Sequence, residues 1–143
     1  MRPRVVIAEA IAQAGIEALA VHCDVVDCVG LDRDALTECL ADAHALIVRS
    51  ATQVDSDMIG SALQLKVIGR AGIGVDNIDI EAATSAGVVV VNAPQANIIS
   101  AAEHTVALLL GQARNLPRAD AVLRSGVWAV SYTHLTLPTI LLV

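Results

Sequence analysis

The chain has 143 residues, of which 55% are hydrophobic, and it contains one Trp, one Tyr and no Phe. Its net charge is -6, and a single lysine stands among its nine basic residues, which argues against nucleic acid or an anionic membrane as a partner. No apolar run approaches the roughly 20 residues that a membrane-spanning helix needs. We therefore expect one domain with a core of Val, Ile, Leu and Ala, the usual content of a buried parallel sheet.

Short apolar runs alternate with helical patterns up to residue 91. The runs predict strands at residues 5–8, 24–26, 45–48, 66–69 and 88–91. Between them, helical spacing predicts helices at residues 11–20, 32–43, 55–63 and 79–85. Asp32 is expected to cap the second helix, and Met58, Ile59 and Leu63 are expected to form one face of the third. This alternation predicts an α/β fold, in which right-handed crossovers build a parallel sheet.

Beyond the fifth strand the pattern changes. Residues 100–114 predict a long apolar helix, in which Ser100 is the N-cap and Glu103 completes a capping box. Another helix is predicted from Pro117 to Arg124, and no further strand is predicted after it. Two helices that leave a finished sheet are typical of the entrance to a second domain.

Three loops at one rim of the predicted sheet carry the candidate binding residues. The carboxyl ends of parallel strands meet at one edge, and ligands of such sheets bind beyond that edge. Arg49 and Ser50 follow the third strand, Arg70 and residues 71–74 follow the fourth, and residues 92–97 follow the fifth. Guanidinium groups suit carboxylates and phosphates. The sequence therefore predicts an anion site at this rim, on which the two arginines converge.

The glycine-rich stretch after the fourth strand has other interpretations. Gly72 and Gly74 permit a sharp turn and the close approach of a ligand, but an ordinary tight turn uses glycine in the same way. The stretch also resembles the dinucleotide-binding pattern G-x-G-x-x-G. Asn77 occupies the third glycine position, and no acidic residue follows the next strand, so the dinucleotide interpretation is disfavoured.

No catalytic or metal-binding constellation stands out. His104 lies beside Glu103, but adjacent helical residues point away from each other and cannot form an acid–base pair. Cys23, Cys28 and Cys39 lack the spacing of zinc ligands or of a redox pair, and they are expected to be buried and reduced. No signal peptide is recognisable, so we expect a cytoplasmic protein.

Three ordered blocks resemble the D-isomer-specific 2-hydroxyacid dehydrogenases: residues 48–52, residues 69–79, and residues 92–103. The resemblance covers residues 1–128. It implies that residues 1–98 form a flavodoxin-like parallel sheet with helices on both faces, which binds the substrate. Residues 99–129 would then be connecting helices at the start of a truncated NAD-binding Rossmann domain. The resemblance also implies a cytoplasmic, homo-oligomeric enzyme that uses NAD to oxidise a small phosphorylated hydroxy acid.

The resemblance implies roles for single residues. Six fall where the family holds its substrate: Arg49, Ser50, Arg70, Gly72, Gly74 and Asn97. Ile73 falls beside the nicotinamide end of the cofactor. The family's own G-x-G-x-x-G segment and its catalytic arginine, glutamate and histidine come after Trp128, and nothing in this chain matches them. We therefore expect half of a substrate site, with no catalytic residue, no metal and no activity in the fragment itself.

Residues 130–143 fit neither the family nor a helix. Residues 130–139 are a possible translation of a transposon-type sequencing adapter, and Ala129, Ile140 and Val143 are compatible with its continuation. We therefore expect a non-native tail, and a source gene that continues differently past Trp128. The alternative is a genuine divergent terminus.

Two other functions stay open at this stage. One is a different D-2-hydroxyacid dehydrogenase, of the glyoxylate or hydroxypyruvate reductase, lactate or formate type, which would differ in whether Arg49 and Arg70 select a phosphate. The other is a free-standing flavodoxin-like ligand-binding or regulatory module, which the genomic sequence beyond Trp128 would distinguish.

Overall fold

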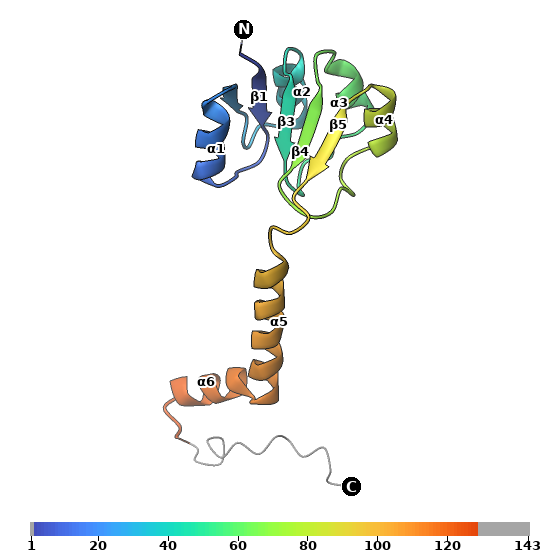
Figure 1. Cartoon of the computed structure of the whole chain (residues 1–143). Coiled ribbons are helices and arrows are strands. Elements are labelled where there is room, and N and C mark those ends of the chain that lie inside the picture. Colours follow the sequence, from blue (N-terminus) through green and yellow to red (C-terminus); the bar gives the residue numbers. More distant parts are fainter. Residues whose placement is uncertain (1, 129–143) are drawn as a thin grey trace. The chain divides into compact units, whose positions relative to one another are not determined.

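The structure is a computed structural model that describes residues 2–128. Its strands are β1 (Arg4–Ile7), β2 (Asp24–Asp27), β3 (Ala45–Val48), β4 (Val67–Arg70) and β5 (Val89–Asn92). Its helices are α1 (Gln13–Ala20), α2 (Arg33–Leu40), α3 (Ser56–Ser61), α4 (Ile80–Ser85), α5 (Ile98–Ala113) and α6 (Leu116–Arg124). The chain divides into two compact units, Met1–Ala96 and Asn97–Val143, and the first holds the whole sheet (Figure 1).

All strand pairings are parallel, and the strand order is β2-β1-β3-β4-β5. This confirms the predicted α/β fold, and each predicted strand differs from the observed one by at most one residue at either end. The runs form strands because Val and Ile, which are branched at Cβ, fit a pleated and buried surface. The chain direction across the sheet reverses between β1 and β3, which makes this the point where α/β sheets commonly bind ligands.

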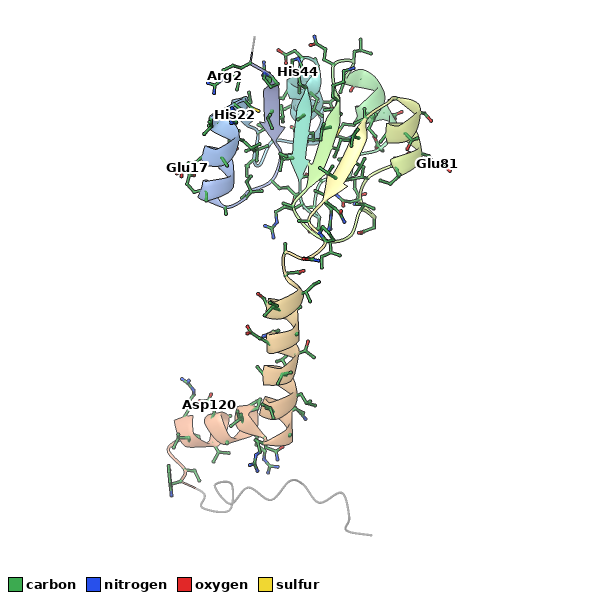
Figure 2. The ribbon with its side chains drawn as sticks, viewed as in Figure 1. Arg2, Glu17, His22, His44, Glu81 and Asp120 are labelled. Atoms are coloured by element: carbon green, nitrogen blue, oxygen red, sulfur yellow. The ribbon has the colours of Figure 1, made fainter. Side chains whose placement is uncertain are left out.

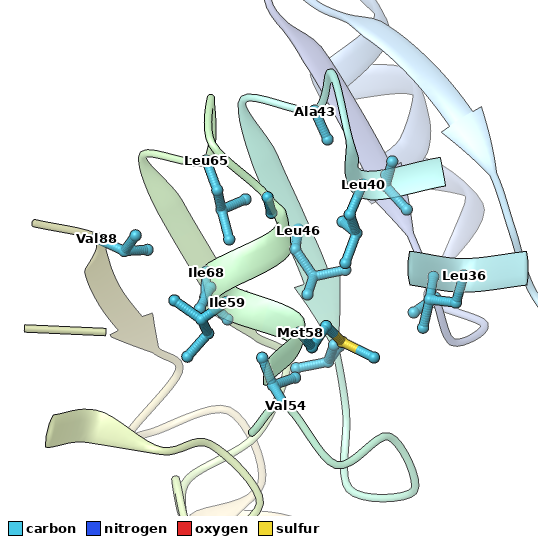
Figure 3. Packing of buried hydrophobic residues seen from close by; sticks show 14 of the residues in the cluster. Leu36, Leu40, Ala43, Leu46, Val54, Met58, Ile59, Leu65, Ile68 and Val88 are labelled. Carbon is cyan, nitrogen blue, oxygen red and sulfur yellow. The ribbon is translucent and has the colours of Figure 1, made fainter. Parts of the chain in front are cut away.

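The main core lies between one face of the sheet and the helices α2, α3 and α4. Helices α2 and α3 lie behind the strands in Figure 1. The strands contribute four residues with no exposed surface: Val6, Leu46, Val48 and Ile68. The helices contribute Leu36, Leu40, Met58, Ile59 and Ala83 (Figure 3).

The opposite face of the sheet is covered unequally. Strand pairing aligns Val5, Ala45, Val67 and Val89 in one row across this face. The exposed fraction rises along the row, from 3% at Val5 to 58% at Val89, with the two residues between them half-buried. Helix α1 contacts the sheet at β2, at the well-covered end, and contributes no buried residue of its own. The sheet therefore has one face that packs against α2, α3 and α4 and another that is open toward β5.

Aspartate caps begin three of the helices in the first unit. The carboxylates of Asp32, Asp55 and Asp79 each accept a hydrogen bond from the backbone N–H three residues later, at 2.9, 3.0 and 2.9 Å. The predicted cap at Asp32 is confirmed. Asp55 also pairs with Arg33, whose Nη2 lies 2.7 and 2.6 Å from the two carboxylate oxygens, so the beginnings of α2 and α3 are joined.

Two expectations about helix geometry are wrong. Helix α5 begins at Ile98 with Asn97 as the N-cap residue, so Ser100 lies inside the first turn and cannot form the predicted capping box. Ile98 and Ile99 extend the helix at its N-terminus, so the predicted beginning at Ser100 was too late. Leu63 is 85% exposed, because α3 ends at Ser61 and the chain then leaves the helical path.

The expectation of three buried thiols is only partly right. Cys28 is buried, whereas Cys23 and Cys39 are partly exposed, and all three are free thiols. Cys28 lies directly after β2, where the chain passes over the core, whereas Cys23 precedes that strand.

The second unit presents most of its large apolar side chains to solvent. Helices α5 and α6 contain no buried residue. On α5 the exposed group is Ile98, Ile99, Val106, Leu108, Leu109 and Leu110. Even so, no helix within residues 2–128 is long and apolar enough to cross a membrane. The assignment of this unit to a cofactor-binding domain stays a prediction, and the adapter hypothesis for residues 130–143 lies outside the described residues.

Candidate functional site

The candidate residues of the first unit lie at the carboxyl ends of neighbouring strands. Arg49 and Ser50 follow β3 directly, and Arg70 is the last residue of β4. The strand register places Val48 opposite Arg70, so the two loops start at the same edge. We call residues 49–52 the 49–52 loop and residues 71–77 the glycine turn; the latter contains Gly72, Ile73 and Gly74.

A carboxylate holds the backbone of the 49–52 loop. The two oxygens of Glu9, which follows β1, accept hydrogen bonds from the backbone N–H groups of Arg49 at 2.9 Å, Ala51 at 3.2 Å and Thr52 at 2.9 Å. Partial burial by itself raises the pKa of Glu9, but the bonds from Thr52, Arg49 and Ala51 outweigh it and lower the pKa below its usual 4.5. Glu9 is therefore ionised in the folded protein and fixes this loop.

The Glu9→Gln variant is expected to lose stability at neutral pH. Because folding lowers the pKa of Glu9, the unfolded chain binds its proton more readily, so the stabilisation is complete above 4.5 and disappears as the pH falls through the lower folded value. Three hydrogen bonds to a partly solvated carboxylate suggest a loss of about 1 kcal/mol at about pH 7, and little difference at about pH 2. Urea unfolding of both proteins at these pH values measures the effect. Glu17→Gln on α1 is the control, and parallel pH profiles for wild type and Glu9→Gln would contradict the expectation.

A buried amide connects the same loop to Arg70. Asn77 is 3% exposed, and its Oδ1 accepts a hydrogen bond from Arg70 Nε at 3.1 Å. Its Nδ2 donates to the backbone carbonyls of Arg49 at 2.9 Å and Thr52 at 2.7 Å. The loop is thus held through its N–H groups by Glu9 and through its carbonyls by Asn77.

The glycine turn leaves room for the Arg70 side chain. A Cβ atom at Gly72 would lie 2.5 Å from Arg70 Nη1, and one at Gly74 would lie 2.6 Å from Asp76 Oδ1. The turn is also tied to the loop after β5, because Ala93 donates its N–H to the Gly72 carbonyl at 2.9 Å. Ile73 is 43% exposed on this turn, where a flat ligand could lie against it.

The two arginines have different neighbours. Arg70 lies over Gly72, whereas Arg49 Nη1 lies 3.5 Å from the carbonyl oxygen of Ala10, after β1. Arg49 borders a cavity of about 560 Å³ between the ends of β1 and β3, whose other walls include Leu36 and Met58. The convergence of the two arginines on one anion stays a prediction.

The remaining candidates are less tightly held. Ser50 is exposed in the 49–52 loop. Asn97 belongs to the second unit, where it is the exposed N-cap residue of α5 and makes no side-chain capping bond. Its part in the site stays a prediction.

The histidines near the sheet lie away from the rim. His22 and His44 are at the amino-terminal end of the sheet (Figure 2), and His44 Nδ1 accepts a hydrogen bond from the Arg4 backbone at 3.2 Å. Within residues 2–128, no group of three His, Cys, Asp or Glu side chains is arranged to hold a metal ion.

Neither Glu9 nor Asn77 was predicted from the sequence as a residue of this site. Asn77 was interpreted only as a departure from a glycine pattern, although it lies between the aliphatic residues Val75 and Ile78. That position was the available signal for a buried, fully bonded amide. Glu9 gave no signal, because its partners come 40 residues later in the chain.

The family model for the catalytic domain of the D-isomer specific 2-hydroxyacid dehydrogenases matches residues 5–141 of the sequence. The chain therefore belongs to this family, as the resemblance of its three sequence blocks implied.

Individual curated proteins of this family are also similar to the chain. The D-3-phosphoglycerate dehydrogenase of Mycobacterium tuberculosis (strain ATCC 25618 / H37Rv) is 49% identical over 126 residues, which are 88% of this chain and 24% of that protein. The chain thus spans about a quarter of the length of this curated relative.

Solved structures agree on the fold. The NAD+-bound 3-phosphoglycerate dehydrogenase of Entamoeba histolytica superposes with a TM-score of 0.67 at 26% identity, covering 80% of this chain and 40% of that one. The NADPH-dependent glyoxylate/hydroxypyruvate reductase of Sinorhizobium meliloti, in complex with citrate, has a TM-score of 0.79 at 26% identity, covering 96% and 43%. Structural similarity therefore supports the family and does not separate its members.

Proposed function

We propose that this chain is the N-terminal part of an NAD-dependent D-3-phosphoglycerate dehydrogenase, an oxidoreductase that converts 3-phosphoglycerate to 3-phosphohydroxypyruvate on the route to L-serine. The observation that carries the proposal is the 49% identity over 88% of the chain to a protein of that name. Two arginines at one rim suit a substrate with a carboxylate and a phosphate. By family resemblance, we further propose that the complete enzyme is a cytoplasmic homo-oligomer.

The proposed substrate site consists of the arginines and their surroundings. Arg49 and Arg70 would hold the anionic groups, and Ser50 and Asn97 would add polar contacts. Gly72 would contribute space rather than a donor, because its N–H already bonds to the Arg70 carbonyl at 2.9 Å. Gly74 would let the ligand approach the turn.

The proposed cofactor is NAD, which supplies the hydride acceptor when bound. The half-exposed Ile73 suits contact with the nicotinamide end. The glycine turn does not suit the pyrophosphate, because the Asn77 side chain fills the position that a third glycine would leave open and is bonded into the 49–52 loop. We therefore propose that the main cofactor-binding residues lie in the part that the longer relatives have, and that this chain alone forms no NADH.

D-3-phosphoglycerate is expected to bind this chain weakly and in a salt-sensitive way. Exposed charged contacts contribute about 1 kcal/mol each, which gives about millimolar affinity for two arginines once association entropy is included. Arg49→Ala and Arg70→Ala should each weaken binding about fivefold. NMR titration measures this, with Arg124→Ala on α6 as the control of equal charge change. Tight binding that ignores both arginines, or NADH formation, would contradict the proposal.

A glyoxylate/hydroxypyruvate reductase is the second candidate, because the structure of such an enzyme superposes on 96% of this chain with a TM-score of 0.79. D-glycerate, which lacks the phosphate, distinguishes the two. If D-glycerate binds as well as D-3-phosphoglycerate does, the reductase is favoured.

A further inference from the structure

We propose that Asn77 is a positioning residue of the rim: it fixes the direction of the Arg70 guanidinium and joins that group to the 49–52 loop. An anion would then meet an arginine that is already oriented. The proposal rests on the proposed function only for the identity of the anion.

The amide of Asn77 has a single possible orientation. Arg70 Nε can only donate, and the carbonyls of Arg49 and Thr52 can only accept. Oδ1 must therefore face Arg70, and Nδ2 must face the loop, as the three bonds of 3.1, 2.9 and 2.7 Å show. Both N–H groups of the amide are used, and its side chain is buried, so the alternative amide orientation would leave buried groups unpaired.

The backbone of Asn77 is fixed as well. Its carbonyl accepts the N–H of Val54 at 2.8 Å, and the next residue, Ile78, forms a parallel bridge with Val54. Asp79 then donates its N–H to the Val54 carbonyl at 2.9 Å. Residues 77–79, which carry the amide, therefore lie beside Val54, just after the 49–52 loop.

The position of the two Nη groups of Arg70 is determined by Asn77 and Gly72. Nε is bonded to Asn77, and Nη1 lies over the backbone of Gly72. A guanidinium pairs with a carboxylate or phosphate either through Nη1 and Nη2 or through Nε and one Nη, and because Nε is bonded to Asn77 here, the Nη1 and Nη2 pair is left. Asn77 and Gly72 together therefore determine where Arg70 presents its charge.

A purely structural role is the alternative, since Asn77 also satisfies two loop carbonyls. The two roles differ in their dependence on Arg70. If Asn77 acts through Arg70, its removal weakens anion binding only while Arg70 is present. If it acts by supporting the fold, its removal weakens binding by the same factor with or without Arg70.

The test uses the whole chain, with inorganic phosphate as the probe in an NMR titration. Asn77→Ala is expected to weaken phosphate binding about fivefold, and to change it less than about 1.5-fold in the Arg70→Ala background. Equal factors in the two backgrounds would overturn the proposal. Core amide signals report whether each variant stays folded.

A second measurement needs no ligand. The Arg70 Nε–H should exchange slowly with solvent in the wild type and about tenfold faster or more in Asn77→Ala. Equally fast exchange in both proteins would overturn the proposal. If the wild type binds no phosphate, the proposed function fails, while this measurement still decides the role of Asn77.

Gly72→Ala provides an independent variant if Asn77→Ala does not fold. Its new Cβ would displace Arg70 Nη1 and leave the Asn77–loop bonds intact, so phosphate binding should weaken, and it should weaken less in the Arg70→Ala background. The matched control is Gly60→Ala, where a Cβ meets no atom within 4 Å. Unchanged binding in Gly72→Ala would contradict the proposed orientation.

Discussion

Replacing Leu46 with Ala is expected to lower the free energy of unfolding by about 3 kcal/mol, because a fully buried leucine loses its transfer free energy and leaves a cavity. Leu46 is 0% exposed at the centre of β3, and it packs with residues of α2 and α3 (Figure 3). Close-packed surroundings cannot collapse fully around the missing atoms. Urea unfolding followed by circular dichroism measures the change.

Leu63→Ala is the matched control, since it makes the same chemical change at a side chain that is 85% exposed. Its effect should stay within about 0.5 kcal/mol. A loss at Leu63 comparable to that at Leu46 would mean that the chain beyond α3 packs differently from the structure.

Cys28 is expected to react with iodoacetamide at about pH 8 at least about a hundredfold more slowly than Cys23. Cys28 is 3% exposed, and burial raises the pKa of its thiol from 9.0 to about 11, with a hydrogen bond to Cys39 as a further cause. A rise of this size reduces the thiolate fraction about a hundredfold, and limited access slows the reaction further.

Mass spectrometry of alkylated peptides measures the three rates in one sample, so the partly exposed Cys23 serves as an internal control. In denaturing urea the rates should become similar. A fast reaction of Cys28 in the native protein would show that the segment after β2 opens readily.

The strands were predictable because their evidence is local. Each apolar run is both a good strand former and buried in the sheet, so propensity and packing agree at β3 and its neighbours. Helix ends were harder: Ser100 and Glu103 have the residue types of a capping box, but the isoleucines before them continue the helix. The residue types permit a helix that begins either at Ile98 or after Ser100, and in the structure it begins at Ile98.

The meeting of the candidate loops at one rim could be predicted from the sequence, but the contacts within and between these loops could not. Parallel strands necessarily bring the loops that carry Arg49 and Arg70 to one edge. The groups that hold the 49–52 loop, Glu9 and Asn77, act across 25 to 43 residues of sequence. Such contacts depend on the three-dimensional path of the chain, which residue spacing does not encode.

The exposed valines of β5 have a consequence for the amount of this protein that a cell would keep. Val89 and Val91 remain 58% and 48% exposed there, although the other face of the same sheet packs against helices. Each Å² of apolar surface left in water forgoes about 25 cal/mol of stabilisation. Chaperones and proteases continuously sort chains whose folding is marginal or whose apolar surface stays accessible. We therefore expect the abundance of this chain in a cell to fall if Val89 and Val91 stay uncovered.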